Sequence, residues 1–165
     1  LPRAFLAGGS ELYFVVDLND HDASTARLVG GEGTPIPDGS FGCNEFYRSD
    51  PVVLGESLLY FSCVFETLRR VDPGSPALEV KELLQAYSVP GAIGLNDLAV
   101  FVVEIEGGYE VWKSDGSSAG TVLGFTFPSE ISFAGLAQRV AGRAVISAHG
   151  PSGYGLYAIS PAISF

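Results

Sequence analysis

The chain has 165 residues, of which 47% are apolar and 17% are charged, a composition typical of a folded domain with a sizeable core. Its net charge of −10 argues against nucleic acid as a partner, because phosphate backbones are bound through clustered Lys and Arg. No apolar run approaches the length that crosses a bilayer. We therefore expect neither nucleic-acid binding nor membrane insertion.

Glycine and proline are frequent, at 21 and 10 residues, and they fall between short apolar runs. Such a pattern is typical of many turns joining short strands, and it predicts an all-β fold. The sequence contains no Met, and it begins at Leu1 without the charged-then-apolar order of a signal peptide. This start is what we expect of a processed chain or of one part of a longer polypeptide.

Four segments share one order: a glycine, a short apolar strand, a polar turn and a second apolar strand. Phe14, Phe61, Phe101 and Ile146 occupy the same place in these repeats and recur every 40 to 47 residues. This period is typical of the four-stranded blades of a β-propeller. The predicted strands follow in chain order: Leu12–Val16, Ala26–Val29, Leu58–Phe65, Thr67–Val71, Leu78–Leu83, Leu98–Val103, Tyr109–Lys113, Val122–Phe127, Ala137–Val140 and Gly155–Ile159.

The segment Leu78–Leu83 is the one place where local propensity and repeat position disagree. Its residues favour a helix, and its apolar positions fit neither a helical nor a strand period cleanly. Its place in the repeat favours an outer strand, and we predict a strand there.

Several predicted strands are apolar along their whole length, Leu58–Phe65 and Leu98–Val103 among them. A strand with one wet face would alternate polar and apolar residues, so these strands must be covered on both faces. Blades of antiparallel strands stacked around an axis provide that cover, and a β-sandwich is the alternative. The repeats divide into blades at approximately residues 5–50, 51–90, 91–136 and 137–165. Because about three and a half to four blades are few for a ring, we expect part of a larger propeller, completed by further blades or by another protein chain.

The third repeat contains the segment Tyr109–Leu123, with the sequence YEVWKSDGSSAGTVL. This segment resembles the ELWxSDGTxxGT repeat of large bacterial surface and secreted proteins, a repeat also described as hyalin-like. The resemblance implies a β-propeller-like architecture and an extracytoplasmic location, and it supplies no catalytic residue. From the residues themselves we expect a strand, a tight turn and the start of the next strand, which gives a structural role to Trp112, Asp115, Gly116, Gly120 and Thr121.

An acidic cluster with the sequence DLNDHD follows the first predicted strand. Carboxylate and amide oxygens on a tight loop suit a hard cation, so calcium bound by Asp17, Asn19, Asp20 and Asp22 is one hypothesis. The spacing breaks the EF-hand pattern and lacks its glycine and its distal Glu. A solvated hairpin tip, with no cofactor in the protein, is the alternative.

The two cysteines, Cys43 and Cys63, leave two alternatives open. A disulfide between them would fit an oxidising compartment, and two separate buried thiols fit the sequence equally well. No CxxC motif is present, so neither a metal knuckle nor a redox pair is expected.

Aromatic residues beside the predicted turns are candidates for glycan binding, because aromatic faces stack on sugar rings. Ordinary packing between blades is the alternative explanation for them. These residues are Phe46, Tyr47, Tyr87 and Tyr154.

Motifs that carry chemistry are absent from the sequence. The two histidines are too few for a zinc site, and no GxSxG nucleophile elbow occurs. We therefore predict a non-catalytic binding or scaffolding module, for adhesion or glycan binding outside the cytoplasm, and not an enzyme. The alternative is a carbohydrate-active or other hydrolytic enzyme, or a subunit of one, with a central polar pocket.

Overall fold

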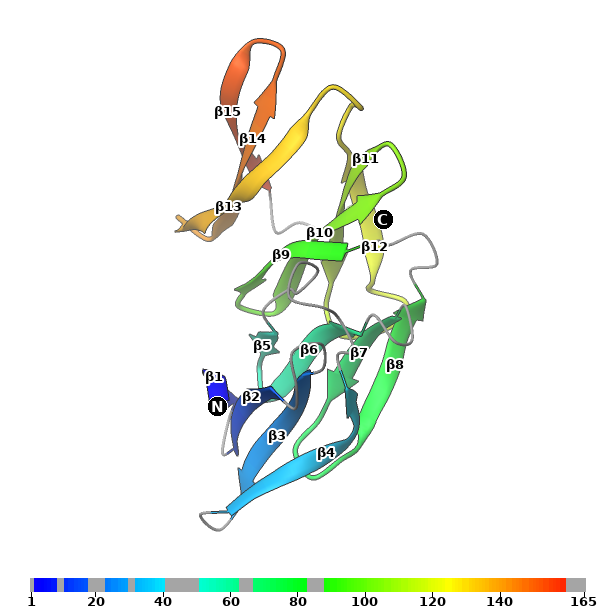
Figure 1. Ribbon diagram of the computed structural model, residues 1–165, viewed down its shortest axis with the longest axis vertical. Helices are drawn as coiled ribbons and strands as arrows, with labels where there is room; N and C mark the ends of the chain where they lie inside the picture. The colour runs from blue at the N-terminus through cyan, green and yellow to red at the C-terminus, as the bar shows by residue number, and fades with distance from the viewer. Residues whose placement is uncertain are drawn as a thin grey trace.

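The computed structural model of the chain is shown in Figure 1. It describes the backbone of residues 2–8, 11–17, 23–29, 32–40, 51–62, 67–82 and 88–159. Side chains are described from residue 51 onward within these ranges, except at residues 82, 134 and 136–138. Every regular element in these ranges is a β-strand. The described part of the chain contains no helix with the length and hydropathy needed to cross a membrane.

The strands form four antiparallel sheets, and across each sheet the strands lie in chain order. The first sheet contains β1 (Pro2–Gly8), β2 (Glu11–Asp17), β3 (Ala23–Val29) and β4 (Glu32–Ser40). The second contains β5 (Val52–Leu54), β6 (Ser57–Ser62), β7 (Thr67–Val71) and β8 (Ala77–Glu82). The third contains β9 (Ser88–Leu95), β10 (Leu98–Ile105), β11 (Gly108–Ser114) and β12 (Val122–Thr126). The fourth contains β13 (Ser132–Val140), β14 (Arg143–Gly150) and β15 (Gly153–Ile159).

The sheets follow one another along the molecule, from β1–β4 at one end to β13–β15 at the other (Figure 1). The first strand of each sheet contacts the first strand of the next, so that β1, β5, β9 and β13 form one continuous inner series. This is the arrangement of propeller blades around an axis, not that of two facing layers. The prediction of an all-β fold with propeller-like blades is therefore confirmed.

Two apolar clusters join the sheets. The first unites the second and third sheets and includes Leu59, Phe61, Leu68, Ala99, Phe101 and Val103. The second unites the third and fourth sheets and includes Val100, Val102, Val111, Ala144, Ile146 and Ala148. Alternate side chains of β10 thus enter alternate clusters, which explains why this strand is apolar along most of its length.

The segment predicted as an outer strand against its helix propensity is a strand, β8. It pairs with β7 through Arg69–Glu79 and Val71–Ala77, and the pairing shifts by one residue at the buried Val80, while Leu78 is exposed. Tertiary pairing overrides local propensity here, because a helix would leave the edge of β7 unpaired.

Candidate functional site

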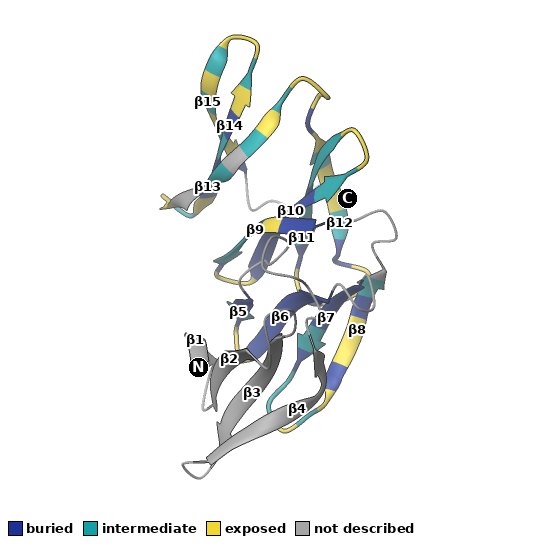
Figure 2. Cartoon of the chain, in the orientation of Figure 1, coloured by how far each residue is buried: buried dark blue, intermediate teal, exposed yellow. Residues whose placement is uncertain are grey.

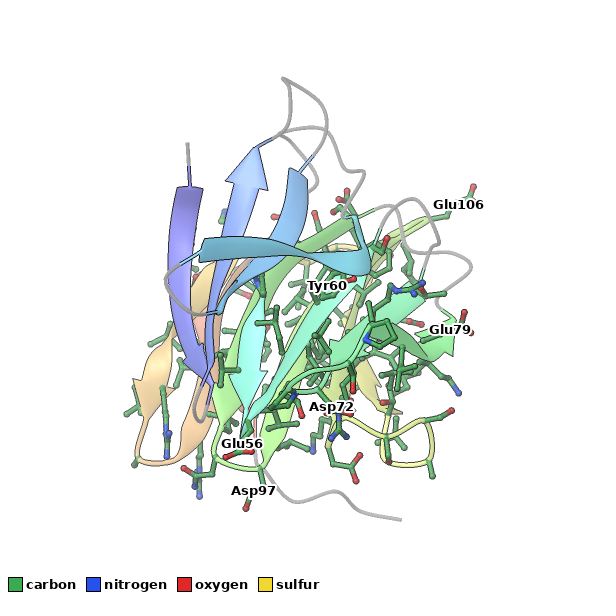
Figure 3. All side chains as sticks on the ribbon, turned by 90° about the horizontal axis from the view of Figure 1, so that it is seen from below. Glu56, Tyr60, Asp72, Glu79, Asp97 and Glu106 are labelled. Carbon is green, nitrogen blue, oxygen red and sulfur yellow. The ribbon has the colours of Figure 1, made fainter. Side chains whose placement is uncertain are left out.

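Polar side chains gather where the turns of the second and third sheets meet. The β5–β6 and β9–β10 turns and the β7–β8 and β11–β12 loops all leave the same end of their sheets, because each joins an odd strand to the following even strand. Figure 3 shows Glu56 and Asp97 together at this end, with Glu106 at the opposite end. The first end therefore brings acidic groups of both sheets close together.

The loop between β11 and β12 is held by its own side chains. Asp115 Oδ1 accepts hydrogen bonds from the Ser117 N–H at 2.8 Å and from the Ser117 hydroxyl at 2.7 Å. The Ser114 hydroxyl accepts the Gly116 N–H at 3.0 Å and lies 2.7 Å from the hydroxyl of Thr121. Thr121 in turn donates to the Ser117 carbonyl at 2.6 Å. The SDG motif thus folds into a closed polar turn before the outer strand begins.

Two glycines fit the geometry of this loop closely. Gly116 has a φ of +87°, a conformation that side chains other than Gly rarely adopt. A Cβ atom at Gly120 would lie 2.1 Å from the Asp115 carboxyl carbon, closer than any real contact. The motif therefore pairs a carboxylate with a glycine that makes room for it.

Gly120→Ala is expected to lower the free energy of unfolding by about 1.5–3 kcal/mol, because Asp115 must move and lose its bonds to Ser117. Gly108→Ala is the control, since a Cβ there meets its nearest atom at an ordinary 3.6 Å. Chemical denaturation of both variants measures the difference. Equal stability of the two variants would contradict the role given to the Gly120–Asp115 contact.

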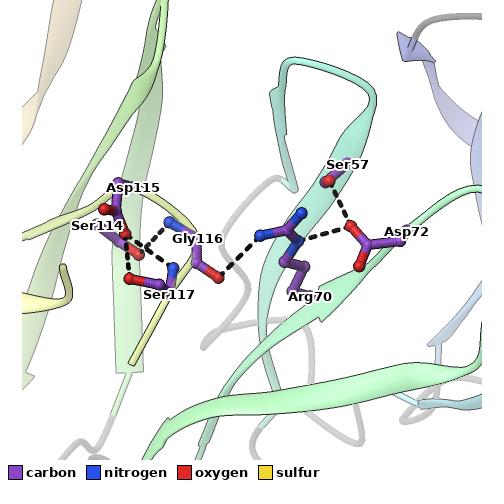
Figure 4. Close-up of polar contacts among 7 residues, drawn as sticks. All are labelled: Ser57, Arg70, Asp72, Ser114, Asp115, Gly116 and Ser117. Carbon is purple, nitrogen blue, oxygen red and sulfur yellow. Dashed lines mark hydrogen bonds and ion pairs between the residues drawn. The ribbon is translucent and has the colours of Figure 1, made fainter. Parts of the chain in front are cut away.

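Arg70 on β7 connects this loop to the second sheet (Figure 4). Its Nε donates to Asp72 Oδ1 at 2.6 Å, and its Nη1 donates to the Gly116 carbonyl at 3.3 Å. The hydroxyl of Ser57 donates to the same oxygen of Asp72 at 2.6 Å. One arginine thus spans two neighbouring sheets, fixed on one side by a carboxylate and on the other by a backbone carbonyl.

A pocket of about 190 Å³ opens beside this connection. It is lined by residues of both sheets: Leu54, Gly55, Ser57, Arg70, Asp97 and Asp115. The side chains of Arg70 and Asp72 are each about one third exposed, at 34% and 33%, so solvent reaches the ion pair. The pocket therefore presents a guanidinium group and two carboxylates to a small polar group entering from solvent.

Two carboxylates at this site are stabilised in their ionised form. Partial burial acts to raise the pKa of Asp72, but the hydrogen bonds from Ser57 and Arg70 and the charge of Arg70 outweigh it and lower that pKa. The two hydrogen bonds from Ser117 lower the pKa of Asp115. Both groups therefore stay charged near neutral pH, which suits electrostatic binding and disfavours either of them as a proton carrier.

A second polar cluster lies at the opposite end of the third sheet. The hydroxyl of buried Ser88 donates to Glu104 at 2.6 Å. Burial, and then the nearby Glu104 carboxylate, raises the pKa of Tyr109, whose ring also packs against Phe133. This cluster brings together fewer charged groups than the pocket at Arg70.

A larger cavity of about 420 Å³ opens beside β15, the edge strand of the fourth sheet, where it adjoins β11 and β12 of the third. Its lining is mainly apolar or backbone, with Lys113 as its charged member: Lys113, Gly124, Phe125, Leu156, Tyr157, Ala158 and Ile159. It lacks the paired acid and base that chemistry requires, so the pocket at Arg70 is the better candidate site.

The residues predicted from sequence are only partly described. Asp17 ends β2, and the other proposed calcium ligands, Asn19, Asp20 and Asp22, lie outside the described residues. The same holds for Phe46, Tyr47, Tyr87, Cys43 and Cys63. In the described ranges, no group of three or more His, Cys, Asp or Glu side chains could hold a metal ion.

The remaining predicted residues are described. Tyr154 is 82% exposed, and its ring meets that of His149 edge-on at 4.9 Å. Trp112 packs against the first apolar cluster, and its ring N–H donates to Glu110 at 2.8 Å. Sequence reasoning missed the roles of Arg70 and Asp72, although the second repeat places Asp72 two residues before Gly74, much as Asp115 precedes Gly116.

No protein-family model matches the sequence, and no curated protein matches it. Among solved structures, virginiamycin B lyase from Staphylococcus aureus is similar with a TM-score of 0.59 and 15% identity, over 96% of this chain and 55% of the lyase chain. A catalytically inactive variant of that lyase with quinupristin gives a TM-score of 0.58 and 13% identity, over 98% and 56% of the two chains. Luciferin-regenerating enzyme gives a TM-score of 0.54 and 10% identity, over 88% and 53%.

These similarities establish the class of fold. The chain has the fold of a β-propeller, and it spans a little over half the length of the structures that it resembles. At identities of 10 to 15% the likeness shows the fold alone.

The prediction that this chain is not an enzyme is corrected by the same comparison. That prediction treated a β-repeat without a catalytic motif as non-catalytic, whereas solved structures that share the fold include a lyase and a luciferin-regenerating enzyme. The physical reason is that a propeller can assemble a site from the turns of several blades. Such a site is defined by geometry, and no contiguous motif reveals it.

Proposed function

We propose that this chain is part of a β-propeller enzyme of the hydrolase or lyase class. The observation that carries the proposal is the pocket where Arg70 and Asp97, from neighbouring sheets, line one cavity. The similarity in fold to virginiamycin B lyase and to luciferin-regenerating enzyme supports the class of protein.

The two residues supply complementary chemistry. Ester or lactone hydrolysis, and elimination beside a carboxylate, both require a group that accepts a proton and a cation that stabilises negative charge developing on an oxygen. Asp97, in the β9–β10 turn, supplies the carboxylate that accepts the proton. Arg70 supplies the cation, and it is held in place by Asp72 and by the Gly116 carbonyl.

The size of the pocket limits what it admits. At about 190 Å³ it is smaller than the cavities that enclose drug-sized ligands, which are about 300–1,000 Å³. We propose that it takes only the reacting polar group of the substrate, an ester, a lactone or the carboxylate next to the bond that an elimination breaks. The rest of the substrate then lies across the exposed turns that carry Glu56 and Asp97.

The test is an activity screen of the native polypeptide that carries this chain. The substrates are chromogenic esters and lactones, for hydrolysis, and uronides, whose elimination creates an absorbing double bond. We expect turnover in at least one class, reduced by Arg70→Gln, because loss of the cation removes stabilisation of the charged transition state. Absence of turnover in every class would overturn the proposal.

A further inference from the structure

The fourth sheet differs from the second and third in how its central strand is buried (Figure 2). Every residue of β6 is buried, and so are the first six residues of β10. In β14 only alternate residues are buried: Ala144, Ile146 and Ala148. A central strand is covered on both faces where a sheet lies on each side of it, and within the described ranges a sheet covers β14 on one face only.

The uncovered face of the fourth sheet is rich in apolar groups. Residues paired across two strands lie on the same face of a sheet, so the pairing between β15 and β14 identifies the residues of this face. The pairs are Ala158 with Val145, Leu156 with Ser147 and Tyr154 with His149. Tyr154 is 82% exposed and Leu156 is 74% exposed. Val140 on β13, opposite Arg143, adds a side chain that is 56% exposed. Large apolar side chains gathered on one sheet face usually mark an interface.

The covered face of the same sheet shows what such an interface looks like in this protein. There Ala144, Ile146 and Ala148 pack against Val100 and Val102 of the third sheet. The repeat thus presents apolar side chains on both faces of a central strand, one face to each neighbouring blade. Continuing the repeat by one blade would cover the second face of β14 in the same way.

We infer that this outer face, defined by Val140, Val145, Tyr154, Leu156 and Ala158, is an inter-blade interface, and that a further blade of the same polypeptide covers it. The chain, with its four sheets, covers 55–56% of the lyase chain that it resembles. If four blades make up that share, a closed ring of the full length has about seven blades. Two copies of this chain would instead make a ring of eight blades. Further blades of one polypeptide therefore fit the length better, and this inference does not depend on the proposed activity.

The polar groups at the rim of this face indicate the chemistry of the covering blade. Arg143 and His149 lie on the outer side of β14, and both are exposed. The covering sheet should therefore present apolar side chains at its centre and a carboxylate opposite Arg143.

Thiol labelling of the native polypeptide tests the inference. Leu156→Cys is expected to react with a maleimide at least about tenfold more slowly than Leu78→Cys, a control position that is 52% exposed on β8. Peptide mass spectrometry reads each site separately, so the natural cysteines need not be removed. In denaturant the two sites should react at the same rate.

The labelling rates distinguish three arrangements of the outer face. Slow labelling of the Leu156→Cys variant at every protein concentration supports a covering blade in the same polypeptide. Labelling as fast as that of Leu78→Cys shows an open face and overturns the inference. Protection that disappears on dilution, with light scattering showing dissociation, assigns the cover to a second copy and also overturns it.

Discussion

Phe101→Ala is expected to lower the free energy of unfolding by about 3–5 kcal/mol. Phe101 is 2% exposed on β10 and lies in the cluster that joins the second and third sheets. The truncation removes contacts from both sheets and leaves a cavity. The backbone cannot collapse into it, because β10 is paired on both sides, with Ala92 and Trp112 opposite Phe101. The midpoint of a urea titration of the native polypeptide measures the loss.

Leu123→Ala is the matched control for this prediction. Leu123 lies on β12 of the same sheet and is 45% exposed, so its truncation is expected to cost about 1 kcal/mol or less. If both variants lost the same stability, the sheets would not be joined through the side chain of Phe101.

Asp97→Asn is expected to lower kcat by about 100- to 10,000-fold on the substrate found in the activity screen, with a smaller change in KM. The amide keeps the size and the hydrogen-bonding groups of the side chain but cannot accept the proton. Because Arg70 still faces the pocket in this variant, substrate binding should be largely retained. Steady-state kinetics of the purified variant measures both constants.

Glu106→Gln is the control, since it neutralises another exposed carboxylate in a two-residue turn of the same strand, at the opposite end of β10 (Figure 3). Its kcat should equal that of the parent protein. Equal kcat values for Asp97→Asn and the parent would remove Asp97 from the proposed chemistry and leave the fold assignment untouched.

The architecture could be predicted from the sequence because the signals for it are local. Uninterrupted apolar runs such as Leu98–Val103 require cover on both faces, and their period of about 40 residues gives the size of a blade. The helix-favouring segment at Leu78–Leu83 shows the same rule at work. The conformation of this segment is set by its pairing with β7, and the position of the segment in the repeat predicts that pairing.

The candidate site could not be predicted in the same way, because its residues meet only across two sheets. Arg70 lies 46 positions before Gly116, and nothing in either local sequence marks their contact. The SDG turn was visible in the sequence, but its partner was not. A blade period gives the size of a sheet and does not determine which side chains face each other between sheets.

The turn that carries Asp97 is also restrained from the fourth sheet. Asn96 has a φ of +53°, which Asn tolerates better than most residues, and Arg139 of β13 donates a hydrogen bond to its side chain. The proposed catalytic carboxylate therefore depends on a neighbouring blade that contributes nothing to the pocket wall. A truncation before β13 would keep every pocket residue and still remove this restraint on the turn.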